Sequence, residues 1–191
     1  MRVIAGRLGG RGLKAPKGRT TRPTTDRVRE ALFSMLGNMD GLRVLDLYAG
    51  SGALGIEALS RGAEHATFVE SQRGAAAVLR ENLEDLGLTT SATLAIVPVA
   101  RARGALAQDA PFDLVLCDPP WPDLDRALAD VWRLLGRELL RAGALVVLEH
   151  PARTALEIPR ELPFTIDKTR KWGDTAVTLL LFSENPEELP N

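Results

Sequence analysis

One stretch of the sequence, residues 44–59, constrains the fold more than any other. An apolar run from Val44 to Leu47 passes through Gly50 and Gly52 and continues with apolar residues at helical spacing. This pattern predicts a strand, a tight loop and a helix. Glycines let the backbone approach a ligand closely, and the first amides of the helix add a positive dipole end. A ligand is therefore expected at the carboxyl end of this strand.

The glycine spacing leaves more than one ligand open. Gly50-x-Gly52-x-x-Gly55, followed by Glu70, also satisfies the dinucleotide-binding fingerprint of a nicotinamide or flavin enzyme. Asp46 argues against that interpretation, because a carboxylate beside the loop would repel a pyrophosphate. A ligand with an ammonium and a sulfonium, such as S-adenosylmethionine, would be attracted. Glu70 can accept hydrogen bonds from two ribose hydroxyls. Alternatively, both acids only cap a turn or a helix.

From residue 41 onward, strand and helix patterns alternate. Strands are predicted over 43–47, 65–69, 93–97, 112–117 and 144–149, and helices over 53–61, 72–86, 101–108 and 124–140. Unbroken apolar strands in such an alternation predict a parallel sheet that is buried between helices, an α/β fold. Residues 164–168 and 175–182 have no helix between them, so we expect an antiparallel hairpin at one edge of the sheet.

The first 29 residues hold nine Lys or Arg and one acid, although the whole chain has a net charge of −1. Residues 2–5 and 12–16 predict a small β-hairpin, and residues 28–36 predict a helix that Gly37 ends. A basic arm on an acidic domain indicates contact with a nucleic-acid backbone. The alternative is a solvated, disordered leader. The cations expected to make this contact are Arg7, Arg11, Lys14, Arg19, Arg22 and Arg27.

Composition limits the remaining possibilities. A chain of 191 residues with 45% hydrophobic content can bury one sizeable core. We expect a basic hairpin and helix over 1–37, a catalytic domain over 38–183 and a frayed tail over 184–191. The chain has no long apolar run and no signal-peptide pattern, so a cytoplasmic protein without a membrane contact is expected. A single cysteine and two separated histidines provide neither a disulfide framework nor metal spacing.

A second motif, Asp118-Pro119-Pro120-Trp121, follows the fourth predicted strand of the sheet. Its loop should emerge at the same edge as the glycine loop. Neither proline has an amide hydrogen, which stiffens the loop. The Asp118 carboxylate and the Pro119 carbonyl could accept both N–H groups of an exocyclic amine while Trp121 stacks on the base. This motif predicts a site for methylating a nucleobase amine. The alternative is a structural turn with a capping Asp and a packed Trp.

These motifs resemble the signature of S-adenosylmethionine-dependent amino-group methyltransferases. Their order is similar to that in the bacterial RsmD-type 16S ribosomal RNA guanine 2-amino methyltransferases, and the similarity includes the block 22–33, the segments 46–55, 68–70 and 118–120, and Asn82. The resemblance covers roughly residues 2–183, and the block 22–33 is its most specific part. It implies a Rossmann-like, seven-stranded class I methyltransferase sheet with a C-terminal antiparallel hairpin and a small N-terminal β-hairpin extension.

The resemblance also implies S-adenosylmethionine as cofactor and a guanine in 16S ribosomal RNA, free or in the assembling small subunit, as target. A monomer without a metal is expected. The implied cofactor-binding residues are Asp46, Ala49, Gly50, Ser51, Gly52, Glu70 and Asp118, and the implied catalytic residues are Asp118, Pro119, Pro120 and Trp121.

The sequence departs from the family pattern at two places. Residues 97–101 offer no Asp or Asn for the adenine amine, so the backbone is expected to make that contact. Trp121 stands where Phe or Tyr is also common, which leaves the base preference open. The alternatives are a DNA or RNA adenine amino-methyltransferase, an NAD-binding oxidoreductase and a non-catalytic nucleic-acid-binding protein.

Overall fold

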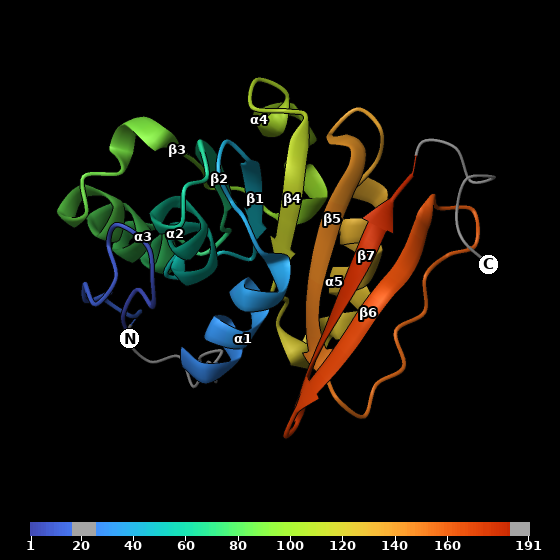
Figure 1. Cartoon of the computed structure of the whole chain (residues 1–191). Helices are drawn as coiled ribbons and strands as arrows, with labels where there is room; N and C mark the ends of the chain where they lie inside the picture. Colours follow the sequence, from blue (N-terminus) through green and yellow to red (C-terminus); the bar gives the residue numbers. More distant parts are fainter. Residues whose placement is uncertain (17–25, 184–191) are drawn as a thin grey trace.

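One open sheet organises the residues that the structure, a computed structural model, describes, which are 1–16 and 26–183 (Figure 1). Its seven strands lie in the order β3-β2-β1-β4-β5-β7-β6. They are β1 (Arg43–Leu47), β2 (His65–Val69), β3 (Ala92–Ala95), β4 (Phe112–Cys117), β5 (Leu140–Pro151), β6 (Phe164–Trp172) and β7 (Thr175–Phe182). Strands β1 to β5 run parallel, and β7 runs antiparallel between β5 and β6. The predicted parallel sheet and its edge hairpin are confirmed.

Helices cover both faces of this sheet. The α-helices are α1 (Asp26–Leu36), α2 (Ala53–Ser60), α3 (Arg73–Asp85), α4 (Arg103–Leu106) and α5 (Leu124–Leu134), and short 3-10 turns are η1 (Thr89–Ser91), η2 (Val99–Arg101) and η3 (Trp121–Asp123). One buried cluster joins α1, α2 and α3 to the first face, and a second joins η2, α4 and α5 to the other. Figure 1 shows α1 on the near side of the sheet and α5 behind it. We call these faces the α1 face and the α5 face.

Two predicted helices have the wrong bounds. The helix expected over 124–140 ends at Leu134, because Leu135 takes an extended conformation and residues 136–139 form a turn that leads into β5. The apolar pattern continues through this turn because Leu135 and Leu139 are buried although they are not helical. The helix expected over 101–108 is divided between η2 and the single turn of α4. Buried apolar residues thus mark the core, but they do not show where a helix stops.

The N-terminal segment packs on α2. The predicted hairpin contains one antiparallel bridge, between Arg2 and Gly12, and it buries Val3 and Leu13 in the cluster of the α1 face. The amides of Ile4 and Ala5 donate to the Glu57 carboxylate at 2.7 and 3.0 Å. The first 16 residues are therefore anchored to the core by Val3 and Leu13 and do not form a detached arm.

Glu57 is also the centre of a buried ionic cluster. Its side chain is 0% exposed and accepts from Arg61 Nε at 2.6 Å, and Arg29 Nε lies 3.9 Å away. Arg29, equally buried, donates to the carbonyl of Arg2 and to Asp26 Oδ1 at 3.1 Å. This cluster connects α1, α2 and the N-terminal segment. None of the helices among residues 1–16 and 26–183 is long and apolar enough to cross a membrane.

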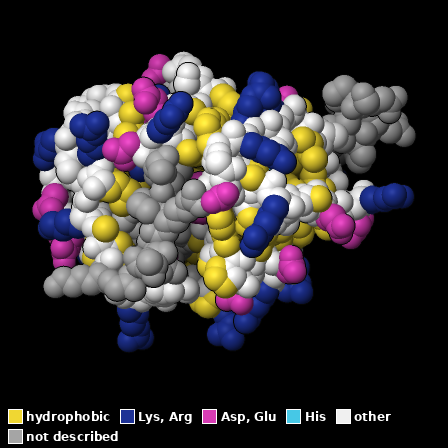
Figure 2. Space-filling model, turned by 90° about the horizontal axis from the view of Figure 1, so that it is seen from below, with side chains coloured by type: hydrophobic (Ala, Val, Ile, Leu, Met, Phe, Trp, Pro, Cys, Tyr) yellow, Lys and Arg dark blue, Asp and Glu magenta, His cyan; other side chains and the backbone are white. Residues whose placement is uncertain are grey.

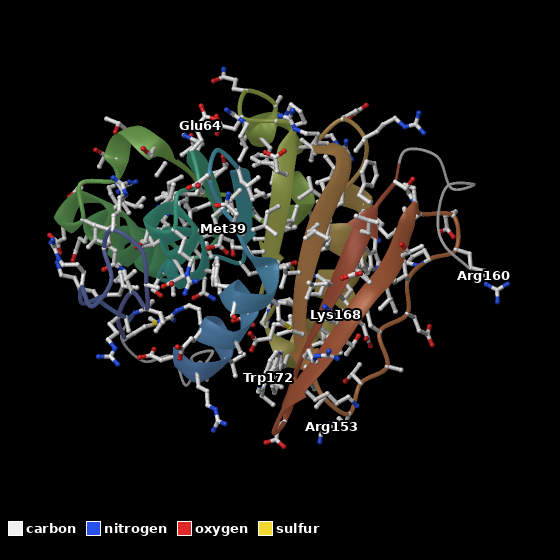
Figure 3. All side chains as sticks on the ribbon, viewed as in Figure 1. Met39, Glu64, Arg153, Arg160, Lys168 and Trp172 are labelled. Carbon is white, nitrogen blue, oxygen red and sulfur yellow. The ribbon has the colours of Figure 1, made fainter. Side chains whose placement is uncertain are left out.

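Removing the Glu57 carboxylate should destabilise the whole fold. In Glu57→Ala, two backbone amides and Arg61 would lose their acceptor, and the buried guanidinium of Arg29 would keep Asp26 but lose its second acid. Removing one partner of a buried ionic cluster typically costs about 3–5 kcal/mol. We expect that loss in urea unfolding followed by circular dichroism. Glu64→Ala, which removes an exposed acid (Figure 3), is the control and should change stability by less than about 0.5 kcal/mol. A Glu57→Ala protein within about 1 kcal/mol of the wild type would contradict this role.

Candidate active site

The strand register brings three acids to one edge of the sheet. Leu47, the last residue of β1, pairs with Val69 on one side and with Cys117 on the other. Glu70 and Asp118 follow these partners directly, and Asp46 precedes Leu47. Because neighbouring strands lie about 4.8 Å apart, the glycine loop, Glu70 and the Asp118 loop begin side by side. This carboxyl edge is the lower edge of the sheet in Figure 1, where ligands of open α/β sheets bind.

The backbone of the glycine loop is left-handed at both glycines. Gly50 and Gly52 have φ angles of +57° and +82°. A Cβ at residue 52 would lie 2.2 Å from Leu79 Cδ1, and a side chain at this positive φ would be strained even if Leu79 moved, so the position favours glycine. The loop continues into α2, and Gly52 precedes its first residue without a side-chain cap. The loop backbone can therefore lie against a ligand.

Asp46 is a buried acid that fixes the start of α2. Its side chain is 1% exposed, and Oδ2 accepts a hydrogen bond from the Gly55 amide at 2.9 Å. Burial raises the pKa of Asp46 to about 7, the nearby charge of Glu70 adds to this shift, and the Gly55 hydrogen bond opposes it. Gly55 itself is required by packing, since a Cβ there would lie 2.3 Å from Phe68 Cε1. The third glycine of the motif thus serves helix–strand contact, and Asp46 retains a proton near neutral pH.

Glu70 holds the glycine loop in place and keeps capacity for a ligand. Its two oxygens accept from the amides of Gly50, at 2.9 Å, and Gln72, at 2.7 Å. A carboxylate has about four acceptor sites, so these bonds leave about two for hydroxyl groups. Beside it, the register of Val69 with Ala95 places Ile96, an apolar side chain that is 39% exposed. From the sequence, Ile96 had no assigned role, because an apolar residue at the end of a strand looks like a core residue until its exposure is known.

The second loop lies next to the first. Asp118 and Trp121 are half-buried, Pro119 is buried, and Pro120 is exposed. The carbonyl of Pro120 accepts from the Asp123 amide at 3.1 Å, which closes the turn that starts η3. The motif residues expected to hold an amine are therefore at the carboxyl edge, one strand from the glycine loop.

Tyr48 connects the glycine loop to α5. Its φ angle is +58°, and no other non-glycine residue among 1–16 and 26–183 has a positive φ. Its hydroxyl donates to the carbonyl of Ala127 at 3.2 Å, and burial raises the pKa of the phenol, which stays neutral. The sequence offered no signal for this role, because the strained backbone is visible only in three dimensions.

The basic candidates occupy different environments. Arg7 and Arg27 are exposed. Arg11 donates to the Asp85 carbonyl at 3.2 Å, and Lys14 Nζ lies 2.8 Å from Asp85 Oδ2 and 3.2 Å from Glu81 Oε2. A phosphate would therefore compete with acids of α3 for Lys14. The remaining two candidates, Arg19 and Arg22, lie outside the described residues.

Asn82 links this basic segment to the glycine loop. Its side chain is 2% exposed; its Oδ1 accepts from the Lys14 amide at 2.8 Å, and its Nδ2 donates to the carbonyls of Lys14 at 3.1 Å and Ser51 at 2.9 Å. A single amide on α3 thus holds the N-terminal segment and the loop together. Residues 1–16 and 26–183 contain no group of His, Cys, Asp and Glu side chains that could hold a metal ion.

The family described as Conserved hypothetical protein 95 matches residues 1–181 of this sequence. The chain belongs to this family. YlbH of Bacillus subtilis is 41% identical over 187 residues, which cover 94% of this chain and 97% of YlbH. The Ribosomal RNA small subunit methyltransferase D of Haemophilus influenzae is 33% identical over 171 residues, 88% of each chain.

Solved structures agree with this assignment. The structure of yhhF from Escherichia coli superposes with a TM-score of 0.81 at 34% identity and covers 97% of this chain and 99% of that chain. The RsmD family suggested by the resemblance is confirmed, as are the seven-stranded methyltransferase fold and S-adenosylmethionine as the cofactor of the family. The oxidoreductase alternative is set aside, in agreement with the two acids beside the glycine loop.

The tight packing of Gly55 gives a direct test of the loop geometry. In Gly55→Ala, the new methyl group would collide with the ring of Phe68, and overpacking of this kind costs about 1–3 kcal/mol. Gly74→Ala is the matched control, because a Cβ at this helical glycine would meet nothing within 4 Å. That variant should be neutral or more stable by up to about 1 kcal/mol. Equal stability of the two variants in thermal unfolding would show that Gly55 is not constrained by packing.

Proposed function

We propose that this protein transfers a methyl group from S-adenosylmethionine to the exocyclic 2-amino group of a guanine in 16S ribosomal RNA. The observation that carries the proposal is the placement of Asp46, Glu70 and Asp118 along one sheet edge, between a glycine loop and a proline loop. Relatives named as ribosomal RNA small subunit methyltransferases support the RNA class. The guanine amine is proposed from the Asp-Pro-Pro loop and the resemblance.

The residues around the glycine loop fit this cofactor. Glu70 has acceptor capacity for the ribose hydroxyls, and Asp46, whose pKa burial raises to about 7, would be ionised more readily beside a cationic ligand. The backbone of residues 49–52 can contact the amino-acid part, and Ile96 offers an apolar surface for the adenine. When bound, S-adenosylmethionine supplies an activated methyl group on a sulfonium. A pyrophosphate, in contrast, would be repelled by the Glu70 carboxylate and by Asp46 wherever that group is ionised.

The proline loop acts on the target amine. The nitrogen of an exocyclic amine is a weak nucleophile because its lone pair is delocalised into the ring. The Asp118 carboxylate and the Pro119 carbonyl can each accept one N–H, which favours a localised lone pair that points away from them. Trp121 can stack on the base. The proton released from the nitrogen can pass to water. These groups act mainly on turnover, since the interaction strengthens toward the transition state.

Product analysis tests the proposal. Purified protein would be incubated with 16S rRNA, both naked and in assembling small subunits, and with radiolabelled S-adenosylmethionine, followed by digestion and mass spectrometry of the nucleosides. N2-methylguanosine at one position supports the proposal. N6-methyladenosine would favour the adenine amine, and binding of NAD without methyl transfer would favour an oxidoreductase; either result would overturn it.

Asp118→Ala should lose methyl transfer while it keeps the fold and the affinity for the cofactor. Loss of one preorganised acceptor typically lowers the rate by about 10²–10³-fold. The measurement is single-turnover methylation, with a thermal melt to verify folding. Asp123→Ala, which removes an exposed acid from the same loop, should stay within about 2-fold of the wild type. A folded Asp118→Ala protein that methylates as fast as Asp123→Ala would rule out the acceptor role.

The raised pKa of Asp46 predicts a pH-dependent affinity. Below about pH 7 the buried carboxyl of the ligand-free protein is protonated, and a cationic ligand favours its ionised form. S-adenosylmethionine should therefore bind about 10-fold more tightly at pH 8 than at pH 6, with a plateau above. Asp46→Asn lacks the titrating carboxyl, so any pH dependence of its affinity comes from the ligand itself. Identical pH profiles for the two proteins would exclude Asp46 as the group that titrates.

The raised pKa of Asp46 also makes the stability of the fold depend on pH. The folded state holds a proton that the unfolded state releases between about pH 4 and pH 7. The ligand-free wild type should thus lose stability relative to Asp46→Asn as the pH rises through this window.

A further inference from the structure

Strand β6 exposes three cations that the proposed site does not use. Lys168, Arg170 and Lys171 are exposed, and none of them forms an ion pair within residues 1–16 and 26–183. In the N-terminal segment, by comparison, Lys14 is bound to Glu81 and Asp85. Arg170 Nη1 donates to the carbonyl of Thr169 at 3.4 Å, which leaves its charge uncompensated. A cation without a carboxylate partner keeps its full charge available for a phosphate, whereas a paired cation must first give up its carboxylate.

A β-bulge decides which way these side chains point. Ile166 pairs with Leu180 of the α5-face cluster, and the register then shifts so that Lys168 pairs with Leu179 of the α1-face cluster. Directly paired residues of antiparallel strands share a face. Arg170 pairs with Val177 and follows Lys168 on the α1 face, whereas Lys171 pairs with Ala176 on the α5 face. The extra residue, Asp167, is the one that turns both cations toward the α1 face.

Lys168 and Arg170 lie in a row along β6 that leads to the carboxyl edge of the sheet. Trp172, two residues beyond Arg170 and on the same face, pairs with Thr175, which pairs with Pro151 at the end of β5. Figure 3 shows Lys168 part-way along β6 and Trp172 near the end of the hairpin. Strands β4 and β6 are separated by three strand spacings, so Trp172 lies about 14 Å to the side of the Asp118 loop. Viewed from below, this edge carries further Lys and Arg side chains among acidic and hydrophobic ones (Figure 2).

We propose that Lys168 and Arg170 form a phosphate-binding row that holds the RNA beside the target base, on the α1 face of the sheet. The inference rests on the proposed function. The two cations are about 6–7 Å apart along the strand and can contact neighbouring phosphates. The N-terminal segment lies at the opposite end of the sheet on the same face, so the RNA is contacted on both sides of the Asp118 loop.

A different role would also place cations on this strand. β6 is an edge strand of the sheet, and charged side chains on an edge discourage pairing with other chains. For that role Lys171 would matter as much as Lys168 and Arg170, and the effect of removing them would be self-association. Only RNA contact requires the two cations of one face and leaves the third unimportant.

The test compares the double variant Lys168→Gln/Arg170→Gln with Lys171→Gln, both in the full chain. Equilibrium binding of 16S rRNA transcribed in vitro is measured over a range of KCl concentrations. The double variant should lower the slope of log affinity against log salt by about 1.4–1.8, because each phosphate contact contributes about 0.7–0.9. Lys171→Gln should keep the slope of the wild type. Melting temperature and affinity for S-adenosylmethionine should be unchanged in both.

The outcomes separate this inference from the proposed function. A wild type that methylates 16S rRNA, together with an unchanged slope in the double variant, would overturn the phosphate row alone. An equal decrease in slope for Lys171→Gln would also overturn it, since net charge and not one face would then account for binding. A double variant that self-associates at unchanged RNA affinity would assign the cations to edge protection. A wild type that fails to methylate the RNA would overturn the proposed function and the inference with it.

Discussion

The parallel pairing of β1 with β2 and β4 is the constraint on which the site depends. Leu47 has a partner on each side, and the chain leaves all three strands at the same level. A shift of one residue in either pairing would move every side chain of that strand to the opposite face. Such a shift would remove Asp46 from Gly55 and would displace Glu70 or Asp118 from the glycine loop. The hydrophobic strands therefore position the polar groups, because only one register buries both faces.

Burial of acids at this edge has a cost that the backbone offsets. Glu70 accepts from two amides, Gly50 of the glycine loop and Gln72 in the turn before α3, and Asp46 accepts from Gly55 of α2. These bonds fix the loop and keep the two carboxyl groups near each other, and burial together with the charge of Glu70 raises the pKa of Asp46 to about 7. Part of the repulsion between the acids is thus retained in the ligand-free protein. A cationic ligand would relieve it, which is a physical reason for the preference over a pyrophosphate.

The N-terminal segment and the catalytic sheet share buried polar contacts. Glu57 of α2 accepts from the segment and from Arg61, and Asn82 of α3 bonds both the segment and the glycine loop. Neither residue can lose its partners without leaving a buried polar group unsatisfied. In the proposed function, the segment that is expected to contact RNA would therefore be held at a defined distance from the cofactor loop.

Much of the fold and of the candidate site followed from local patterns. Alternating apolar runs predicted the parallel sheet, and the motifs of residues 46–55 and 118–121 predicted the two loops at its edge, because glycine, proline and strand-end acids have strong local preferences. The end of α5 at Leu134 was misjudged, since Leu135 and Leu139 beyond it are buried and so continue the apolar pattern of the helix. Ile96, Tyr48 and Asn82 were missed or left without a role. Their importance arises from neighbours distant in sequence.

The sequence by itself determined which residue types could bind a cofactor and an amine, because those depend on charge, backbone freedom and spacing within a few residues. Only the tertiary structure decided that Lys14 is engaged by acids of α3 while Lys168 is not, and that a bulge at Asp167 turns Lys168 and Arg170 to one face. Both facts depend on strand register and helix packing. Those are set by the burial of the whole core, which no short stretch of sequence contains.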